Sequence, residues 1–197
     1  SKMEQKSFAV GLRIEHLQSF INEHQYGKYA NHPSLKAADY KLAVKTSNGR
    51  GVYTFCMCPG GKVINSSSEA GGIVVNGMSN QARDEANANS AVLVTVGPED
   101  FASSHPLAGI TYQRELEQKA FELGGKDYSV PVMRVEDYLN DTLDLKMEEV
   151  SCSVQPNVRY AKLSQIFSNE VNLALKEGLQ LMNHKFTGFT EKAMLSG

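Results

Sequence analysis

Two cysteines separated by one residue, Cys56 and Cys58, are the side chains whose type and spacing first suggest chemistry. On a strand, residues i and i+2 point to the same side, so the two thiols could be presented together. Zinc sites, however, use cysteine pairs with wider spacing and need two further ligands, which no nearby His or Cys supplies. The redox-active dithiol motif has two intervening residues at a helix start. We therefore predict neither a metal site nor a redox-active dithiol. The remaining interpretation is that the two cysteines are small, half-buried side chains in a core or beside a ligand.

The residues after these cysteines form a tight turn between two apolar, strand-like runs, followed by small polar residues. Glycines remove side-chain bulk, so the backbone can come close to a flat or charged ligand. Glu69 and Arg83 are lone charges in Gly/Ser/Asn-rich connectors, and the Arg83 guanidinium is suited to two-point pairing with an anionic substrate. The predicted ligand-facing residues are Cys58, Pro59, Gly60, Gly61, Glu69, Asn76, Ser79, Arg83 and Asn89. In the alternative interpretation the glycines only make turns and Arg83 is a solvated loop charge.

Several catalytic and cofactor motifs are missing from the sequence. It has no G-x-G-x-x-G, since Gly49-Arg50-Gly51 lies between strand-like runs and lacks the third glycine. A P-loop, a nucleophile elbow and an H-E-x-x-H motif are also missing, and the five histidines are scattered. The catalytic residue is therefore not predicted. We expect no tightly bound dinucleotide on this chain by itself.

Composition is that of an ordinary globular protein: 197 residues, 41% hydrophobic and 21% charged, with a formal net charge of -2. Lysines and arginines are dispersed, so neither nucleic acid nor an anionic membrane is an expected partner. No apolar run approaches the length of a membrane span. Three cysteines make an odd number, which fits a reducing compartment, and we predict a cytoplasmic location.

The elements that must position these residues divide into a β-rich part, 8–97, and a helix-containing part, 98–197. Alternating apolar residues predict strands over 8–14, 40–46, 51–57, 62–65, 73–76 and 91–96, which suggest an antiparallel meander. Asn48-Gly49 between two such runs is a strong hairpin signal. Helical spacing predicts main helices over about 113–123 and 169–182, the latter capped by Ser168, and short helices over 16–24 and 136–139, with further strands at 130–135 and 147–154. The expected fold class is α+β, with a mostly antiparallel sheet and two main amphipathic helices.

Several blocks of this sequence together resemble one protein family. They are Gly11–His16, Ala37–Leu42, Gly49–Tyr53, Cys56–Ser90 and Pro106–Ile110, with Arg114, Glu117 and Ala120-Phe121. The family resembled is that of the uncharacterised FAD-dependent dehydrogenases, also labelled NAD-utilising dehydrogenases.

The resemblance implies that residues 1–197 are the substrate-side domain from the middle of a larger flavoprotein oxidoreductase. In that family FAD is held by a Rossmann-like half, which this chain lacks, so the fragment is expected to be inactive alone and to carry no cofactor. The implied partners are the FAD-binding domain of the same chain and a small-molecule substrate, with NAD(P)H open as reductant. Self-association through the exposed domain surface is also expected. Two other classes stay open: a small-molecule or peptide binding module, and a structural or oligomerisation domain.

Overall fold

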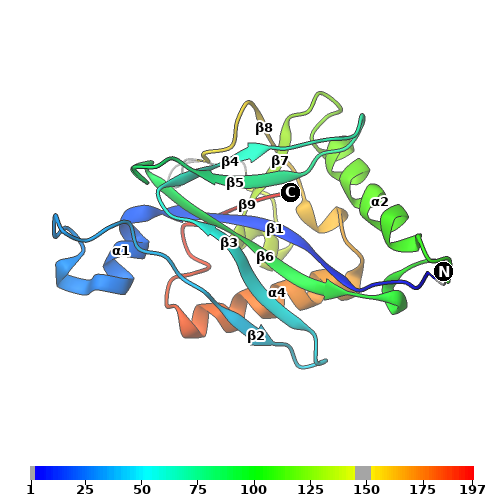
Figure 1. The fold of residues 1–197 in the computed structure, drawn as a ribbon, viewed down its shortest axis with the longest axis horizontal. Helices are drawn as coiled ribbons and strands as arrows, with labels where there is room; N and C mark the ends of the chain where they lie inside the picture. The colour runs from blue at the N-terminus through cyan, green and yellow to red at the C-terminus, as the bar shows by residue number, and fades with distance from the viewer. Residues whose placement is uncertain (1–2, 145–151) are drawn as a thin grey trace.

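A seven-stranded sheet forms the centre of the computed structural model, which describes residues 3–144 and 152–197 (Figure 1). Its strand order is β2-β3-β6-β1-β9-β7-β8, and every pair is antiparallel except β7 with β8. The strands of this sheet are β1 (Phe8–Leu17), β2 (Ala43–Lys45), β3 (Gly51–Cys58), β6 (Asn87–Val96), β7 (Val130–Arg134), β8 (Val158–Tyr160) and β9 (Met194–Ser196). Strands β4 (Gly61–Asn65) and β5 (Val75–Ser79) form a separate two-stranded hairpin.

The helices lie around this sheet. They are α1 (Gln18–Tyr26), α2 (Ala108–Leu123), α3 (Val135–Asn140) and α4 (Asn169–Lys185), with the short 3-10 turns η1 (Gly27–Tyr29), η2 (Pro98–Asp100) and η3 (Leu163–Gln165). The predicted fold class, α+β with a mostly antiparallel sheet, is therefore confirmed. Within the described residues no helix is long and apolar enough to cross a membrane.

One face of the central strands is apolar and is covered by α4, which runs beneath β2, β3 and β6 (Figure 1). Val52, Val92 and Val94 lie on this face and are buried. Helix α4 comes close because it has Gly178 where it meets β3: a Cβ there would lie 2.6 Å from Cγ1 of Val52. As predicted, Ser168 caps the helix, its hydroxyl accepting a hydrogen bond from the N–H of Val171 at 3.3 Å. Burial of valines against this helix forms the main core.

The opposite face of the same strands carries charged and amide side chains. Because successive strand residues alternate in direction, Arg13 and Glu15 of β1 point away from α4, as does Asn89 of β6. The β4–β5 hairpin packs over them: a Cβ on Gly77 would lie 2.2 Å from the Arg13 guanidinium. This polar layer between sheet and hairpin contains the candidate site.

The predicted meander is only partly correct. The hairpin around Asn48-Gly49 is confirmed as β2–β3. The second predicted pair is present as β4–β5, but its second strand runs over Val75–Ser79 rather than 73–76. The chain does not continue strand by strand across one sheet, however, because β4–β5 leaves it and β6 returns to pair with both β3 and β1. Strands from both halves of the sequence share this sheet, since β9 lies between β1 and β7.

The helices match the predictions more closely. Helices α2 and α4 confirm the two main amphipathic helices, and α3 confirms the short one near Glu136. The first predicted helix was placed two residues early, because β1 continues through His16 and Leu17 before α1 begins. Of the predicted strand 147–154, residues 147–151 lie outside the described residues, and 152–154 are not a strand.

Candidate functional site

A buried guanidinium, that of Arg13, is the centre of the polar layer beneath the β4–β5 hairpin. Arg13 is only 4% exposed. Its Nε donates to Oδ1 of Asn89 at 2.9 Å, and its Nη1 to Oδ1 of Asn76 at 3.4 Å. Its Nη2 donates to the carbonyl of Cys56 at 2.8 Å and lies 3.8 Å from Sγ of Cys58. The structure therefore brings together three of the predicted site residues, Cys58, Asn76 and Asn89, around an arginine that was not among the predicted site residues.

A β-bulge in β3 aims the backbone at this arginine. Phe55 pairs with Ala91 but Cys58 pairs with Asn89, so β3 has one extra residue at this point. Cys56 takes a positive φ of 46° there, and its carbonyl turns toward Arg13. Bulges commonly re-aim groups beside functional sites. Cys56 and Cys58 are thus part of a β-bulge that lies against the Arg13 guanidinium.

Among residues 3–144 and 152–197, no carboxylate pairs with the charge of Arg13. In the described part of the chain it forms no ion pair, and its hydrogen-bond acceptors are two amide oxygens, a backbone carbonyl and a cysteine sulfur. Burial lowers the pKa of Arg13, and the cysteines and Glu15 act in the opposite direction. A guanidinium stays charged at neutral pH all the same. The side-chain Nδ2 of Asn89 is also buried, with no hydrogen-bond acceptor among the described residues.

Glu15 is the nearest acidic neighbour along β1, but its oxygens are used elsewhere. They accept hydrogen bonds from Nδ2 of Asn87 at 3.1 Å, from the N–H of Ser153 at 3.1 Å and from the Ser153 hydroxyl. The Cys152 thiol lies 3.3 Å from the same carboxylate. Burial, and then the charge of Glu15, raise the pKa of Cys152 strongly, so this thiol is held protonated. Glu15 therefore anchors the segment that contains Cys152 and Ser153 to the sheet.

The glycine turn between β3 and β4 closes on the protein itself. Gly60 has a φ of +48°, and a Cβ there would lie 1.9 Å from the carbonyl oxygen of Arg83. The Gly60 N–H donates to Oε1 of the buried Gln18 at 2.6 Å, and the Ser79 hydroxyl donates to the Pro59 carbonyl at 2.8 Å. In this structure the turn's close approach is therefore to its own chain.

The two predicted lone charges are not brought to Arg13. Glu69 forms a two-point ion pair with Arg114 of α2, at 2.8 and 2.9 Å. Arg83 is exposed, with a positive φ of 55° in a turn whose geometry is fixed by its N–H donating to Asn80 Oδ1 at 2.6 Å. Neither residue contacts the cluster around Arg13, and their role as ligand contacts stays a prediction.

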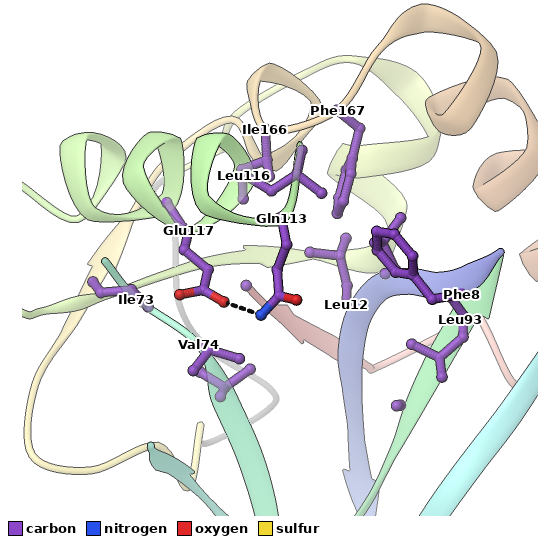
Figure 2. A pocket seen from close by; sticks show the side chains of 17 residues that line it. Phe8, Leu12, Ile73, Val74, Leu93, Gln113, Leu116, Glu117, Ile166 and Phe167 are labelled. Atoms are coloured by element: carbon purple, nitrogen blue, oxygen red, sulfur yellow. Dashed lines mark hydrogen bonds between the residues drawn. The ribbon is translucent and has the colours of Figure 1, made fainter. Parts of the chain in front are cut away.

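A pocket of about 310 Å³ lies at the edge of β1, between the start of this strand, α2 and residues 73–75. Strand β9 pairs only with residues 13–15 of β1, so α2 and Phe167 line the space beside residues 8–12. Most of the lining is apolar, including Phe8, Leu12 and Leu116. Figure 2 shows Gln113 and Glu117 pointing from α2 toward Val74, with Nε2 of Gln113 donating to Oε1 of Glu117 at 2.8 Å.

A hydrophobic strip of the sheet lies partly exposed on the same face as Arg13: Tyr53 and Leu93 are half-buried, and Phe55 is exposed. Tyr53 and Leu93 are register partners there, and Phe55 follows along β3. Phe55 is 58% exposed, and Met78, on the side of the neighbouring hairpin that faces away from Arg13, is 50% exposed. We call Tyr53, Phe55, Leu93 and Met78 the open face. Large exposed apolar side chains grouped on one surface commonly mark an interaction surface.

Comparison with known proteins identifies the family. The model of the family described as "FAD-dependent protein, C-terminal domain-like" matches residues 7–197. The chain belongs to this family. An uncharacterised protein of Clostridium beijerinckii (strain ATCC 51743 / NCIMB 8052) is 48% identical over 197 residues, which are 99% of this chain and 37% of that protein. The chain thus spans little more than a third of its relative, and the family's description links it to a larger FAD-dependent protein. The position in the middle of the parent, expected from the sequence, stays a prediction.

The glycine turn between β3 and β4 has its backbone N–H groups engaged within the described structure. A pyrophosphate needs free backbone N–H groups at a glycine turn before a helix. Here the Gly60 N–H is bonded to Gln18, and Gly61 lies in a strand that meets the carbonyl of Met78. No group of three or more His, Cys, Asp or Glu side chains within residues 3–144 and 152–197 could hold a metal ion.

Proposed function

We propose that this chain is the substrate-side domain of an FAD-dependent oxidoreductase, acting as a dehydrogenase, and that its open face packs against the FAD-binding part of the same protein. The observation that carries the proposal is the partly exposed apolar surface of a domain whose family is described as part of FAD-dependent proteins. A relative of which this chain covers 37% has ample further sequence to cover that surface.

The geometry supports a domain that supplies one side of an active site, with the other side supplied by the rest of the parent protein. The Arg13 cluster, the turn at Cys58–Gly61 and the pocket beside α2 all lie next to the open face, on β1, β3, β5 and β6. In this proposal Cys58, Pro59, Gly60, Gly61, Glu69, Asn76, Ser79, Arg83 and Asn89 surround the flavin or substrate from this side. NAD(P)H is the proposed reductant, and the parent works in the cytoplasm.

The test uses the full-length parent protein. We expect it to purify with a flavin absorption spectrum. The double substitution of Phe55→Ser and Met78→Ser should then weaken the packing of the two parts, so that limited proteolysis separates them faster and flavin is lost more readily. Both effects follow from losing apolar area that is buried only in the assembled protein.

The matched control is Leu173→Ser, because Leu173 of α4 is 65% exposed and lies on the other side of the sheet. It should leave proteolysis and flavin content as in the unaltered protein. A parent without flavin would overturn the proposal. So would an open-face variant that behaves like Leu173→Ser, since the surface would then serve another purpose, such as self-association.

A further inference from the structure

We propose that the pocket between β1 and α2 binds a small amine, a molecule with an apolar body and one ammonium group that pairs with the carboxylate of Glu117. The inference goes beyond the proposed function and does not rest on it, because it concerns binding and not a reaction. The carboxylate and the apolar side chains that contact the molecule in this proposal all line this one pocket.

The first argument is the apolar part of the pocket. Strand β6 pairs with the whole of β1, but on the other edge β9 pairs only with residues 13–15, so the described residues place no strand beside residues 8–12. The pocket at this edge has a volume of about 310 Å³, which is at the small end of ligand sites. Its lining includes the rings of Phe8 and Phe167, and aromatic rings favour contact with another ring. The space therefore fits one small body, such as a benzene ring with a short chain.

The second argument is the sign of the charge in this pocket. Among the described residues that line it, Glu117 has the only charged side chain, and Gln113 has the only other polar one. No lysine or arginine is among them. A cleft that combines apolar walls with charge of one sign concentrates ligands of the opposite sign. The lining therefore favours a cation over an anion.

The third argument is that the Glu117 carboxylate is available to a ligand. A carboxylate has about four acceptor sites. In the described part of the chain its one hydrogen-bond donor is Nε2 of Gln113, at 2.8 Å. The arginine of α2, Arg114, is held instead by the two oxygens of Glu69, at 2.8 and 2.9 Å. Because a partly buried glutamate usually has a cationic partner, an ammonium group from outside the described residues fits this position.

The fourth argument is where the carboxylate lies. The Glu117 carbonyl accepts a hydrogen bond from the N–H of Ile73 at 3.0 Å, which fixes this part of α2 against the chain before β5. Gly72 leaves the carboxylate uncrowded, since a Cβ there would lie 3.3 Å from Oε2 of Glu117. Figure 2 shows Glu117 and Ile73 on one side of the pocket and the rings of Phe8 and Phe167 on the other. A ligand that extends between the two sides needs a cationic head and an apolar body.

The experiment is calorimetric titration of phenethylamine into the full-length parent protein at neutral pH. We expect saturable binding. Binding should be at least about tenfold weaker for 2-phenylethanol, in which a hydroxyl replaces the ammonium group, and for phenylacetate, which has the opposite charge. This comparison uses the unaltered protein and needs no variant.

The variant Glu117→Gln keeps the size of the side chain and removes its charge. It should weaken phenethylamine binding about tenfold and leave 2-phenylethanol binding within about twofold, whereas a purely structural role would weaken both ligands alike. Glu122→Gln is the matched control, at an exposed carboxylate of the same helix that does not line the pocket, and should change neither. Leu116→Trp adds bulk inside the pocket and should weaken both ligands.

Four results would overturn the inference. They are no saturable binding of phenethylamine, equal binding of phenethylamine and either comparison ligand, a Glu117→Gln variant that keeps the preference for the amine, and a Leu116→Trp variant that binds phenethylamine as before. Because these titrations measure neither flavin nor proteolysis, a failure here is separate from a failure of the tests of the proposed function.

Discussion

At the scale of single residues, β1 has a buried polar side chain, His16, on the side of the sheet opposite to Arg13 and Glu15. His16 lies on the α4 side, fully buried among the rings of Phe20, Tyr40 and Phe189. Its Nε2 donates to the Phe189 carbonyl at 2.7 Å, which leaves Nδ1 unprotonated and without a partner in the described residues. Burial lowers the pKa of His16 from its usual 6.5 to about 4, against the effect of the Phe189 carbonyl.

This shift predicts a loss of stability in weak acid. Below pH 6.5 the unfolded chain binds a proton that the folded His16 refuses, so the free energy of unfolding should fall as the pH drops from about 6.5 to about 4. The loss at His16 is at most about 3 kcal/mol. Urea unfolding at pH 7 and pH 5 measures it, and His16→Phe should flatten the pH dependence over this range. An unchanged slope in His16→Phe would refute the assignment.

Gly60 gives a second prediction at this scale. Gly60→Ala should destabilise the protein by about 3 kcal/mol, because the new Cβ meets the Arg83 carbonyl in a backbone conformation that already favours glycine. Gly71→Ala is the matched control: its φ is +75° with nothing within 4 Å of the new Cβ, so only the conformational cost of about 1 kcal/mol applies. Equal losses of unfolding free energy in the two variants would show that the contact at Arg83 is unimportant.

At the scale of elements, the approach of α4 to β3 depends on Gly178. Alanine favours a helix over glycine by about 1 kcal/mol. Gly178→Ala should nevertheless lower the unfolding free energy by about 1 kcal/mol, because its Cβ would lie 2.6 Å from Cγ1 of Val52 and overpacking outweighs propensity.

The double variant Gly178→Ala with Val52→Ala provides the internal check. Removing the valine methyl groups makes room for the new Cβ, so the double variant should lose less stability than the sum of the two single changes. Thermal unfolding of all four proteins measures the coupling. Additive losses would mean that the helix shifts away from β3 without a clash.

The elements that sequence patterns predicted well are those with local signals. Asn48-Gly49 fixed the β2–β3 turn, Ser168 the start of α4 and Gly124 the end of α2. The strands β8 and β9 were missed, because three-residue strands are too short to show alternation and take their partners from distant parts of the chain. The pairing of β6 with β1 could not be predicted either, because no turn motif joins these two strands directly.

At the scale of the whole molecule, the candidate site illustrates the same limit. Asn76, Cys58 and Asn89 could be selected for their residue types, but their convergence on Arg13 depends on the hairpin folding back over β1. The alternation of residues in a strand predicts on which side of the sheet an arginine lies. It does not predict which element packs over that side. The charged pair Arg13 and Glu15 within a long apolar strand was the available signal, since charged residues are rarely buried without a partner.

The position of β9 has a consequence for how the chain is synthesised. Arg13–Glu15 lies in β1, yet one edge of that segment is paired only when Met194–Ser196, about 180 residues later in β9, has been made. Until then the edges of β1 and β7 that β9 joins are unpaired and able to associate with other chains. Because contacts this distant in sequence form slowly, these edges stay open longer than those closed by the local β2–β3 and β4–β5 hairpins.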